Sequence, residues 1–126
     1  IVVPNIDDAY LNLYNIPAFA NFYYCIEHLY YYSPKTLAGV LDLAGFDATV
    51  EAVQEYPLAN HLNWVLRKQP SETLSARRLA PDGELRTTSF EPQWEVLWND
   101  FDASYKNFLR KCGFSDRVWA IAHSKI

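Results

Sequence analysis

The pattern of hydrophobic and polar positions at the start of the chain predicts a strand followed by a helical turn. Residues 1–3 form an apolar run, and Pro4 ends it because proline has no N–H to donate to a β ladder. Asp7 or Asp8 is suited to cap a short helical turn, which Pro17 is expected to end. A short apolar strand is therefore expected to lead into a polar corner.

The segment from Ser33 to Gly45 carries the clearest helical pattern. Ser33 is a good N-cap, and Pro34 loses no needed hydrogen bond at the first helical position. Gly45 can adopt the left-handed conformation that ends a helix. Residues 18–32, by contrast, follow no period of 2 or 3.6, and we interpret them as a packed loop with helical turns. The residues that recur at helical spacing are Leu37, Val40, Leu41 and Ala44.

The middle of the chain predicts a second strand and a second helix. Residues 47–56 alternate as a half-buried strand does, and Pro57 is expected to stop it. Asn60 is expected to cap the helix that follows. The polar stretch 68–89 has weak periodicity and contains the turn signal Pro-Asp-Gly at 81–83, which indicates a loop or a loose hairpin.

A long helix and a short strand are predicted to close the chain. Gly113 is expected to end the helix, and residues 118–122 form a short apolar run. The order strand, helix, strand, helix, helix, strand indicates an α/β fold built as one domain, residues 1–126. The residues expected to line one face of the last helix are Trp94, Leu97, Trp98, Phe101, Tyr105, Phe108, Leu109 and Cys112.

Composition and charge exclude several classes of protein. Half of the 126 residues are hydrophobic, which favours a folded core, and the net charge of -4 argues against nucleic-acid binding. No segment is apolar enough to span a membrane and no signal peptide opens the chain, so a cytoplasmic location is expected. Cys25 and Cys112 show no pairing motif and are interpreted as buried reduced thiols, with a single disulfide in a secreted domain as the alternative. No group of residues has the spacing of metal ligands.

We also expect the chain to be a fragment of a longer protein. It contains no methionine and opens directly on an apolar run that resembles a buried strand. A sheet of three strands alone is too small to cover the large apolar faces of the predicted helices. A larger sheet is therefore expected to continue on the N-terminal side.

The stretch from Phe22 to Phe46 holds the residues best suited to chemistry. Aromatic rings surround an adjacent acid and imidazole, Glu27 and His28. Imidazole titrates near neutrality and suits a general base, and a neighbouring carboxylate can orient it or raise its basicity. We take His28 and Glu27 as the candidate catalytic pair. The alternative is a structural pair that caps backbone groups of a loop.

Other residues in the sequence have both a functional and a structural interpretation. Among the tyrosines near the pair, Tyr24 and Tyr31 are expected to line an acceptor pocket, and the rest to pack in the core. Asp7 and Asp8 could face a ligand, because α/β folds bind ligands at the carboxyl ends of strands, although helix capping explains them equally well. The two remaining histidines are expected to be a surface helix residue, His61, and a structural residue, His123.

An ordered set of motifs resembles the C-terminal half of class I S-adenosylmethionine-dependent methyltransferases. The resemblance is to the broad group that methylates sugars, quinones and polyketide-type acceptors. It covers residues 1–57 well and residues 92–124 loosely. The closing run 117–122 is similar to the last strand of that family, which lies antiparallel to its neighbours. The motifs are Val2-Val3-Pro4-Asn5, Glu27-His28, Tyr31-Tyr32, Ser33-Pro34, Leu37 and Ala44-Gly45-Phe46.

The resemblance implies the C-terminal part of a Rossmann-like sheet of about three strands packed with helices. In that family the cofactor is held by an acidic residue and a Gly-rich turn in the N-terminal half. The four glycines here show no such spacing, so we expect no cofactor-binding residues in this chain and no appreciable S-adenosylmethionine binding by it alone. Some sugar C-methyltransferases of the group use a Glu-His pair preceded by a tyrosine. Here Cys25 stands at the tyrosine position, three residues before His28, and Tyr24 lies one residue earlier.

Two functions follow from these observations. The first is the acceptor-side part of a methyltransferase that uses S-adenosylmethionine and a small-molecule acceptor, with activity residing in the full-length protein. The second is a non-catalytic interaction module whose aromatic surface binds a partner chain. A bare sheet edge at residues 1–3 favours the first, and a self-enclosed core favours the second. Bare apolar faces would also allow a homo-oligomer to form.

Overall fold

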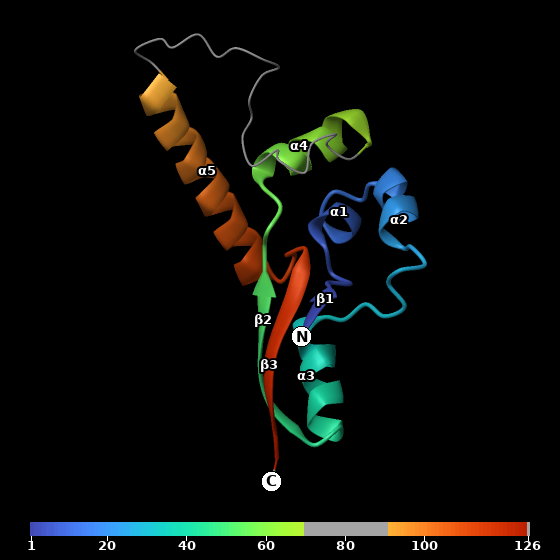
Figure 1. Cartoon of the computed structure of the whole chain (residues 1–126). Helices are drawn as coiled ribbons and strands as arrows, with labels where there is room; N and C mark the ends of the chain where they lie inside the picture. The colour runs from blue at the N-terminus through green and yellow to red at the C-terminus, as the bar shows by residue number, and fades with distance from the viewer. Residues whose placement is uncertain (70–90, 126) are drawn as a thin grey trace.

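The computed structural model describes residues 1–69 and 91–125, and within them the chain folds as three strands and five helices (Figure 1). The α/β class predicted from the sequence is confirmed. The predicted loop or hairpin at 68–89 falls almost entirely outside the described residues. The elements in chain order are β1 (Val2–Pro4), α1 (Ala9–Asn12), α2 (Pro17–Tyr23), α3 (Pro34–Leu43), β2 (Phe46–Val53), α4 (Leu58–Arg67), α5 (Glu91–Cys112) and β3 (Arg117–Ser124).

The sheet has the strand order β1-β3-β2, so the last strand of the chain lies in the middle. β3 is antiparallel to both neighbours, as predicted for the last strand, with Val118 opposite Val3 on one side and Ala52 on the other. Because both outer strands oppose β3, β1 and β2 run in the same direction. Their carboxyl ends therefore lie at the same end of the sheet, on either side of Arg117.

Helix α3 forms where the sequence predicts it and covers one face of the sheet. Ser33 accepts the N–H of Thr36 in a capping box, and Gly45 follows the helix with φ of 83°. Leu37 and Leu41 pack against Val118 and the neighbouring small residues of β3. This cluster is one of two hydrophobic cores and depends on a local pattern, which explains why sequence reasoning found it.

The other helices differ from the predicted boundaries. Pro17 begins α2 rather than ending a helix, because proline suits the first helical position as well as a termination. β2 ends at Val53 instead of reaching residue 56. α4 begins after Pro57, and Asn60 therefore lies within the helix instead of capping it. The first N–H of α4, on Leu58, is bound by the Asp102 carboxylate of α5 at 2.6 Å.

The second core lies beyond the carboxyl ends of β1 and β2, where α1, α2 and α4 come together (Figure 1). Tyr10, Ile16, Phe19 and Trp64 are its buried members. Asn5 fixes the corner between β1 and α1, because its side-chain amide donates to the carbonyl oxygens of Gly113 at 2.9 Å and Ser115 at 2.7 Å. Asn5 thus holds the helices α1, α2 and α4 against the segment that leads into β3.

Part of the apolar surface remains exposed. On the face of the sheet opposite α3, Trp119 is 40% exposed and Ile121 is 70% exposed. α5 packs through its C-terminal part, where Leu109 is fully buried, and its N-terminal part projects away from the sheet (Figure 1). The apolar face of α5 is therefore only partly covered. Its exposed apolar residues are Trp94, Val96, Leu97, Phe101 and Phe108.

Both cysteines are free thiols in the structure. Cys25 is half-buried, and Cys112 is exposed near the end of α5. The expected burial of Cys112 is wrong, because that side of α5 faces outward. Within the described ranges, none of the helices combines the length and the apolar composition that crossing a lipid bilayer requires.

Candidate functional site

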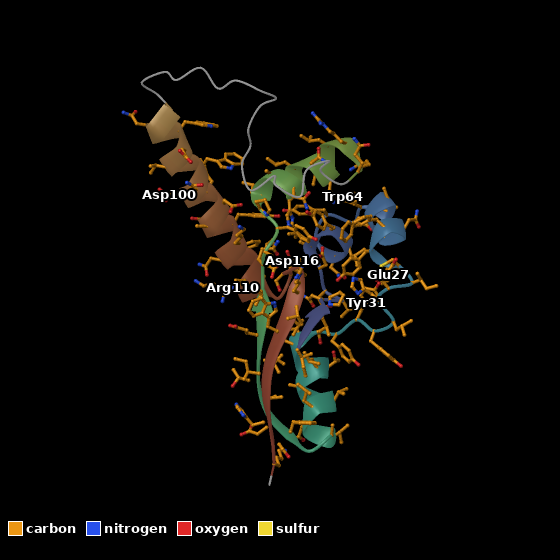
Figure 2. The ribbon with its side chains drawn as sticks, viewed as in Figure 1. Glu27, Tyr31, Trp64, Asp100, Arg110 and Asp116 are labelled. Carbon is orange, nitrogen blue, oxygen red and sulfur yellow. The ribbon has the colours of Figure 1, made fainter. Side chains whose placement is uncertain are left out.

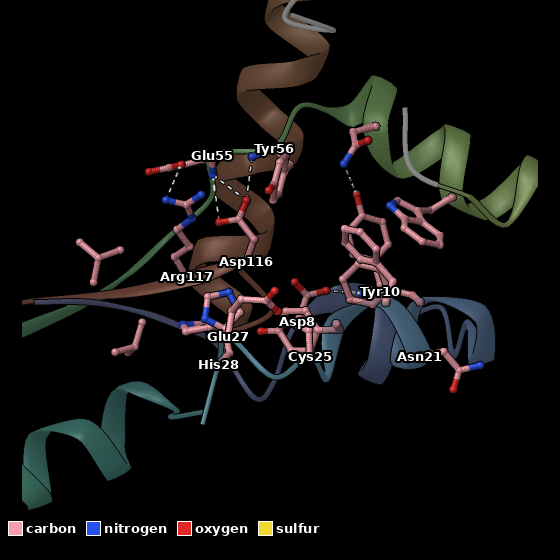
Figure 3. A pocket seen from close by; sticks show the side chains of 18 of the residues that line it. Asp8, Tyr10, Asn21, Cys25, Glu27, His28, Glu55, Tyr56, Asp116 and Arg117 are labelled. Carbon is pink, nitrogen blue, oxygen red and sulfur yellow. Dashed lines mark hydrogen bonds and ion pairs between the residues drawn. The ribbon is translucent and has the colours of Figure 1, made fainter. Parts of the chain in front are cut away.

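A cleft of about 990 Å³ opens where the carboxyl ends of β1 and β2 meet. Its walls come from four parts of the chain: β1 with the segment that leads into α1, α2 with the loop after it, the segment after β2 with α4, and the residues at the start of β3. In α/β folds ligands bind at the carboxyl ends of parallel strands, because the connections diverge there and leave a crevice. Side chains from all four parts line the cleft (Figure 3).

Asp116 binds the segment that follows β2. Its carboxylate accepts the backbone N–H of Tyr56 at 2.7 Å and that of Glu55 at 3.0 Å. Gln54 donates its side-chain amide to the same carboxylate at 3.2 Å and accepts the backbone N–H of Asp116 at 3.0 Å. Asp116 lies at the junction of the sheet with the helices (Figure 2). Its oxygens are thus occupied by donors of the protein, and the residue shapes the wall of the cleft.

Asp8 differs from Asp116, because one of its carboxylate oxygens accepts no hydrogen bond from the described residues. Its Oδ1 atom accepts the N–H of Tyr10 at 2.7 Å and caps α1, as the sequence predicts. Among the described residues no hydrogen bond reaches Oδ2. The side chain is only 1% exposed and lines the cleft. Asp8 therefore presents an unpaired acceptor from a deeply buried position.

Burial shifts the titration of both carboxyl groups. Desolvation raises the pKa of Asp8 from 3.8 to about 8, against the lowering effect of the Tyr10 N–H, and the charge of Asp116 raises it further. Desolvation raises the pKa of Asp116 to about 6, and the N–H groups of Tyr56 and Glu55 limit the rise. Two acids with raised pKa values at one cleft are typical of a functional site, although buried structural carboxyls behave in the same way.

His61 lies behind the cleft at the centre of a buried hydrogen-bond chain. The expectation that it is a surface residue is wrong, because it is 1% exposed and stacks on Tyr10 with 4.2 Å between ring centroids. Gln54 Nε2 lies 3.1 Å from His61 Nε2, and because an amide nitrogen only donates, His61 Nε2 is the acceptor of this contact. His61 Nδ1–H then donates to Tyr105, at 2.7 Å, and Tyr105 donates to Tyr14, at 2.6 Å.

The chain of bonds keeps His61 neutral and in one tautomer. Burial lowers the pKa of His61 to about 3, so the ring carries no charge at physiological pH. The bonds join α4 to α5 through Tyr105 and to the segment after β2 through Gln54. A neutral histidine without a free nitrogen is unsuited to proton transfer. His61 therefore supports the cleft wall instead of taking part in chemistry.

Aromatic rings form the inner end of the cleft. Tyr10 lies 4.3 Å from Phe19, and Trp64 meets Phe19 edge-on at 5.0 Å, each measured between ring centroids. Phe22 lies 5.4 Å from Trp64 and is more than half exposed. Asn60 donates to the Tyr10 hydroxyl at 2.9 Å. The cleft therefore combines a carboxyl group with ring faces and a few polar groups, as small-molecule sites do.

The structure places Glu27 and His28 on the loop after α2, where both line the cleft. Both side chains are exposed, and the two make no ion pair with each other in the described part of the chain. A hydrogen bond from its own backbone N–H holds the pKa of the Glu27 carboxyl below its usual value, with smaller contributions from Cys25 and His28. Glu27 thus lies beside His28 without binding it.

The two tyrosines expected to bind an acceptor lie beside the cleft and are not among its lining residues. Tyr31 uses its hydroxyl to donate to the carbonyl of Tyr23 at 2.6 Å, and it accepts the N–H of Cys25 at 3.3 Å. Tyr24 is half exposed and packs edge-on against Tyr31. In this arrangement Tyr31 holds the loop that carries Glu27 and His28, and Tyr23 lines the cleft.

Sequence reasoning missed Asp116, Tyr10 and Asn60 as cleft residues. Asp116 reaches donors about sixty positions earlier in the chain, at residues 54–56, which no local pattern reveals. Asp8 was considered, because a polar residue after a strand is placed at the ligand side of an α/β sheet. No comparable signal marked the others, since aromatic and amide residues in short helices usually pack or cap.

Comparison with protein-family models, with curated proteins and with solved structures gives no match to this chain. Among residues 1–69 and 91–125, no three or more His, Cys, Asp or Glu side chains are grouped so that they could hold a metal ion. The geometry of the cleft is therefore the basis for proposing a function.

Proposed function

We propose that the chain is the acceptor-side part of an S-adenosylmethionine-dependent methyltransferase that acts on a small molecule. The observation that carries the proposal is the cleft at the carboxyl ends of β1 and β2, which lie on either side of β3, with Glu27 and His28 on its rim. The central antiparallel position of β3 agrees with the strand arrangement that the sequence resemblance implies. The proposal rests on fold and site together, since fold alone does not define an activity.

Within residues 1–69 and 91–125, the glycines do not form the kind of turn that holds the cofactor. Such a site needs glycines that let the backbone approach the ligand at the start of a helix. Gly45 and Gly113 have positive φ, but they follow the ends of α3 and α5, and Gly39 lies inside α3. The proposal therefore assigns only the acceptor side to this chain and derives no step from the cofactor.

The role of His28 in this proposal is to remove a proton from the acceptor. Methyl transfer needs a nucleophile placed next to an electrophilic methyl group, and a general base raises the nucleophilicity of the acceptor. His28 is exposed at the rim, where it can reach a bound molecule, and Glu27 adds a negative charge beside it. The ring-lined interior would hold the body of the acceptor away from water.

Exposed sheet surface gives further support. Ile1 and Val2 at the edge strand are 58% and 53% exposed, and Trp119 and Ile121 on the face opposite α3 are also exposed. The described elements thus leave one sheet edge and one sheet face with apolar residues in solvent. An additional part of a larger sheet would cover both.

A transfer assay tests the proposal. The natural polypeptide that contains this chain is incubated with S-adenosylmethionine labelled in its methyl group and with fractionated small-molecule extracts. We expect label in an organic product of low molecular mass. Absence of any labelled product across acceptor fractions would contradict the proposal, and label found only on protein or nucleic acid would contradict the small-molecule acceptor.

A second candidate, a non-catalytic interaction module, is favoured by one observation. α5 exposes a row of apolar residues along the part that projects from the sheet, and such patches commonly bind partner chains. Replacement of Leu97 and Phe101 by Asp separates the two candidates. An interaction module loses its partner with these changes, whereas methyl transfer continues at the cleft, which neither residue lines.

A further inference from the structure

We propose that the cleft selects a small organic cation, a protonated amine on an aromatic or apolar body, with Asp8 as its counter-charge. The inference names the class of acceptor and rests on the proposed function only in taking this cleft as the acceptor site. The claim about binding holds or fails independently of methyl transfer. Neither the family resemblance nor the catalytic pair on the rim requires it.

The first support is the position of Asp8. Its Oδ1 atom is occupied by the N–H of Tyr10, and no donor from the described residues reaches Oδ2. The side chain is 1% exposed and lines the cleft, so water has little access to it. A buried acceptor left without a donor costs free energy, and a ligand that carries an N–H donor would remove that cost.

The second support is the balance of charges around the cleft. Four acidic side chains line it, and Asp116 already has its own donors. Arg117 is paired with Glu55 at 3.1 Å, so its charge is largely offset. Together with Glu27, which is exposed on the rim, this arrangement places more acidic than basic side chains around the ligand. The acidic residues are Asp8, Glu27, Glu55 and Asp116.

The third support comes from the rings that continue the cleft beyond Asp8. Tyr10, Phe19 and Trp64 are buried and in mutual contact, and Phe22 and Tyr23 also line the space. Ring faces attract cations through their quadrupole, and they also accept an apolar body. A site that combines rings with an unpaired carboxyl group therefore suits a cation attached to an apolar group better than it suits an anion.

Ligand protonation and Asp8 protonation are coupled in this arrangement. Desolvation, with the charge of Asp116, raises the pKa of Asp8 to about 8, so the empty cleft holds a largely protonated acid near neutral pH. A bound cation would displace that proton. The ionisable groups coupled to Asp8 are Tyr10 on its own segment, Tyr23 from α2, Tyr105 from α5 and Asp116 just before β3. Binding is therefore best measured at a pH above the pKa of Asp8, where the carboxyl group is ionised.

Three matched probes test the inference by isothermal titration of the chain at about pH 8.5, below the pKa of an amine, about 10. The probes are phenethylamine, 2-phenylethanol and phenylacetate, which share a ring and differ in charge. We expect the amine to bind at least about tenfold more tightly than the alcohol, because hydrogen bonds to charged groups exceed neutral ones by such a factor. The acid is expected to bind most weakly.

A pair of neighbouring aspartates supplies the matched variants. Asp8→Asn should bring the amine to the affinity of the alcohol, whereas Asp7→Asn should retain the preference, because Asp7 is exposed and does not line the cleft. The selectivity of the unmodified chain gives a readout that needs no variant. Equal binding of amine and alcohol, tighter binding of the acid, or no binding of any probe would overturn the inference.

The outcomes also separate the inference from the proposed function. Selective amine binding without methyl transfer would support the inference and end the methyltransferase proposal. Methyl transfer to neutral acceptors alone would support the methyltransferase and overturn the inference.

Discussion

The carboxylate of Asp116 accepts the backbone N–H of Tyr56, with 2.7 Å between the nitrogen and Oδ2. This bond joins the start of β3 to the segment after β2, although the two residues lie far apart in sequence. The same carboxylate also accepts the N–H of Glu55 and the side-chain amide of Gln54. The wall of the cleft therefore depends on one buried side chain.

Replacing Asp116 by Asn should destabilise the fold. An amide oxygen can accept only part of the bonds that the carboxylate accepts, and its NH₂ group would face the N–H donors of Tyr56 and Glu55. Buried donors left without acceptors cost about 1–3 kcal/mol. Chemical denaturation at pH 7.5 measures the loss.

Asp47→Asn is the matched control for Asp116, because Asp47 lies on β2 with an exposed side chain. Its free energy of unfolding should stay within about 0.5 kcal/mol of the unmodified protein. If the two variants are equally stable, Asp116 does not hold the wall as described.

Stability should fall as pH rises from about 4 to 8. The folded pKa of Asp8 is about 8 and that of Asp116 about 6, whereas both groups titrate near 3.8 when unfolded. Each of these two carboxyl groups binds a proton in the folded chain that it lacks in the unfolded chain, so raising the pH favours unfolding. Buried His61, whose pKa falls from 6.5 to about 3 on folding, offsets one of the two protons below pH 6.5, so the decline is clearest between pH 6.5 and 8. The stabilisation is complete below pH 3.8 and is lost as pH passes the two folded values. Urea denaturation at a series of pH values shows the trend.

Asp8→Asn should remove the upper half of that dependence. The Asp116 contribution ends near pH 6 and that of His61 near pH 6.5, so the variant should show little change between pH 6.5 and 8, where the unmodified protein still loses stability. Asp7→Asn serves as the control, because its side chain is exposed. A parallel decline in all three proteins would show that the folded pKa of Asp8 is not raised.

Tyr105→Phe should destabilise the protein without affecting the charges of the cleft. Tyr105 accepts His61 Nδ1–H and donates to Tyr14, so the loss of its hydroxyl leaves a buried donor without a partner. We expect a loss of about 1–3 kcal/mol in the free energy of unfolding. Thermal unfolding measures it, and Tyr30→Phe, which changes a hydroxyl on an exposed ring, is the control. An unchanged melting temperature would mean that water replaces the lost hydroxyl.

Local signals in the sequence predicted the elements whose ends are fixed nearby. Ser33 and Gly45 bound α3 through contacts within a few residues, and Asp8 caps α1 in the same way. Pro17 was misassigned because proline favours both the start and the region after the end of a helix. The sequence thus indicated the helix and sheet content, but not each boundary.

The site depends on contacts between residues far apart in the chain, which the sequence alone does not reveal. His61 has the position of a surface residue by helical periodicity, yet Tyr10, Gln54 and Tyr105 enclose it from three other elements. The apolar face of α5 has the periodicity of a buried face, although most of it is exposed. Periodicity shows which residues share a face, but tertiary packing decides whether that face is covered.

The turnover of methyl transfer in His28→Ala tests the central claim most directly. A general base contributes about 10²–10⁴-fold, so kcat should fall by at least about 100-fold. The melting temperature should not change, because His28 is exposed and accepts or donates no side-chain hydrogen bond in the described part of the chain. His123→Ala, at an exposed position of β3 outside the cleft, should retain full turnover. Equal turnover in the two variants, or an unmodified protein that transfers no methyl group, would contradict the account.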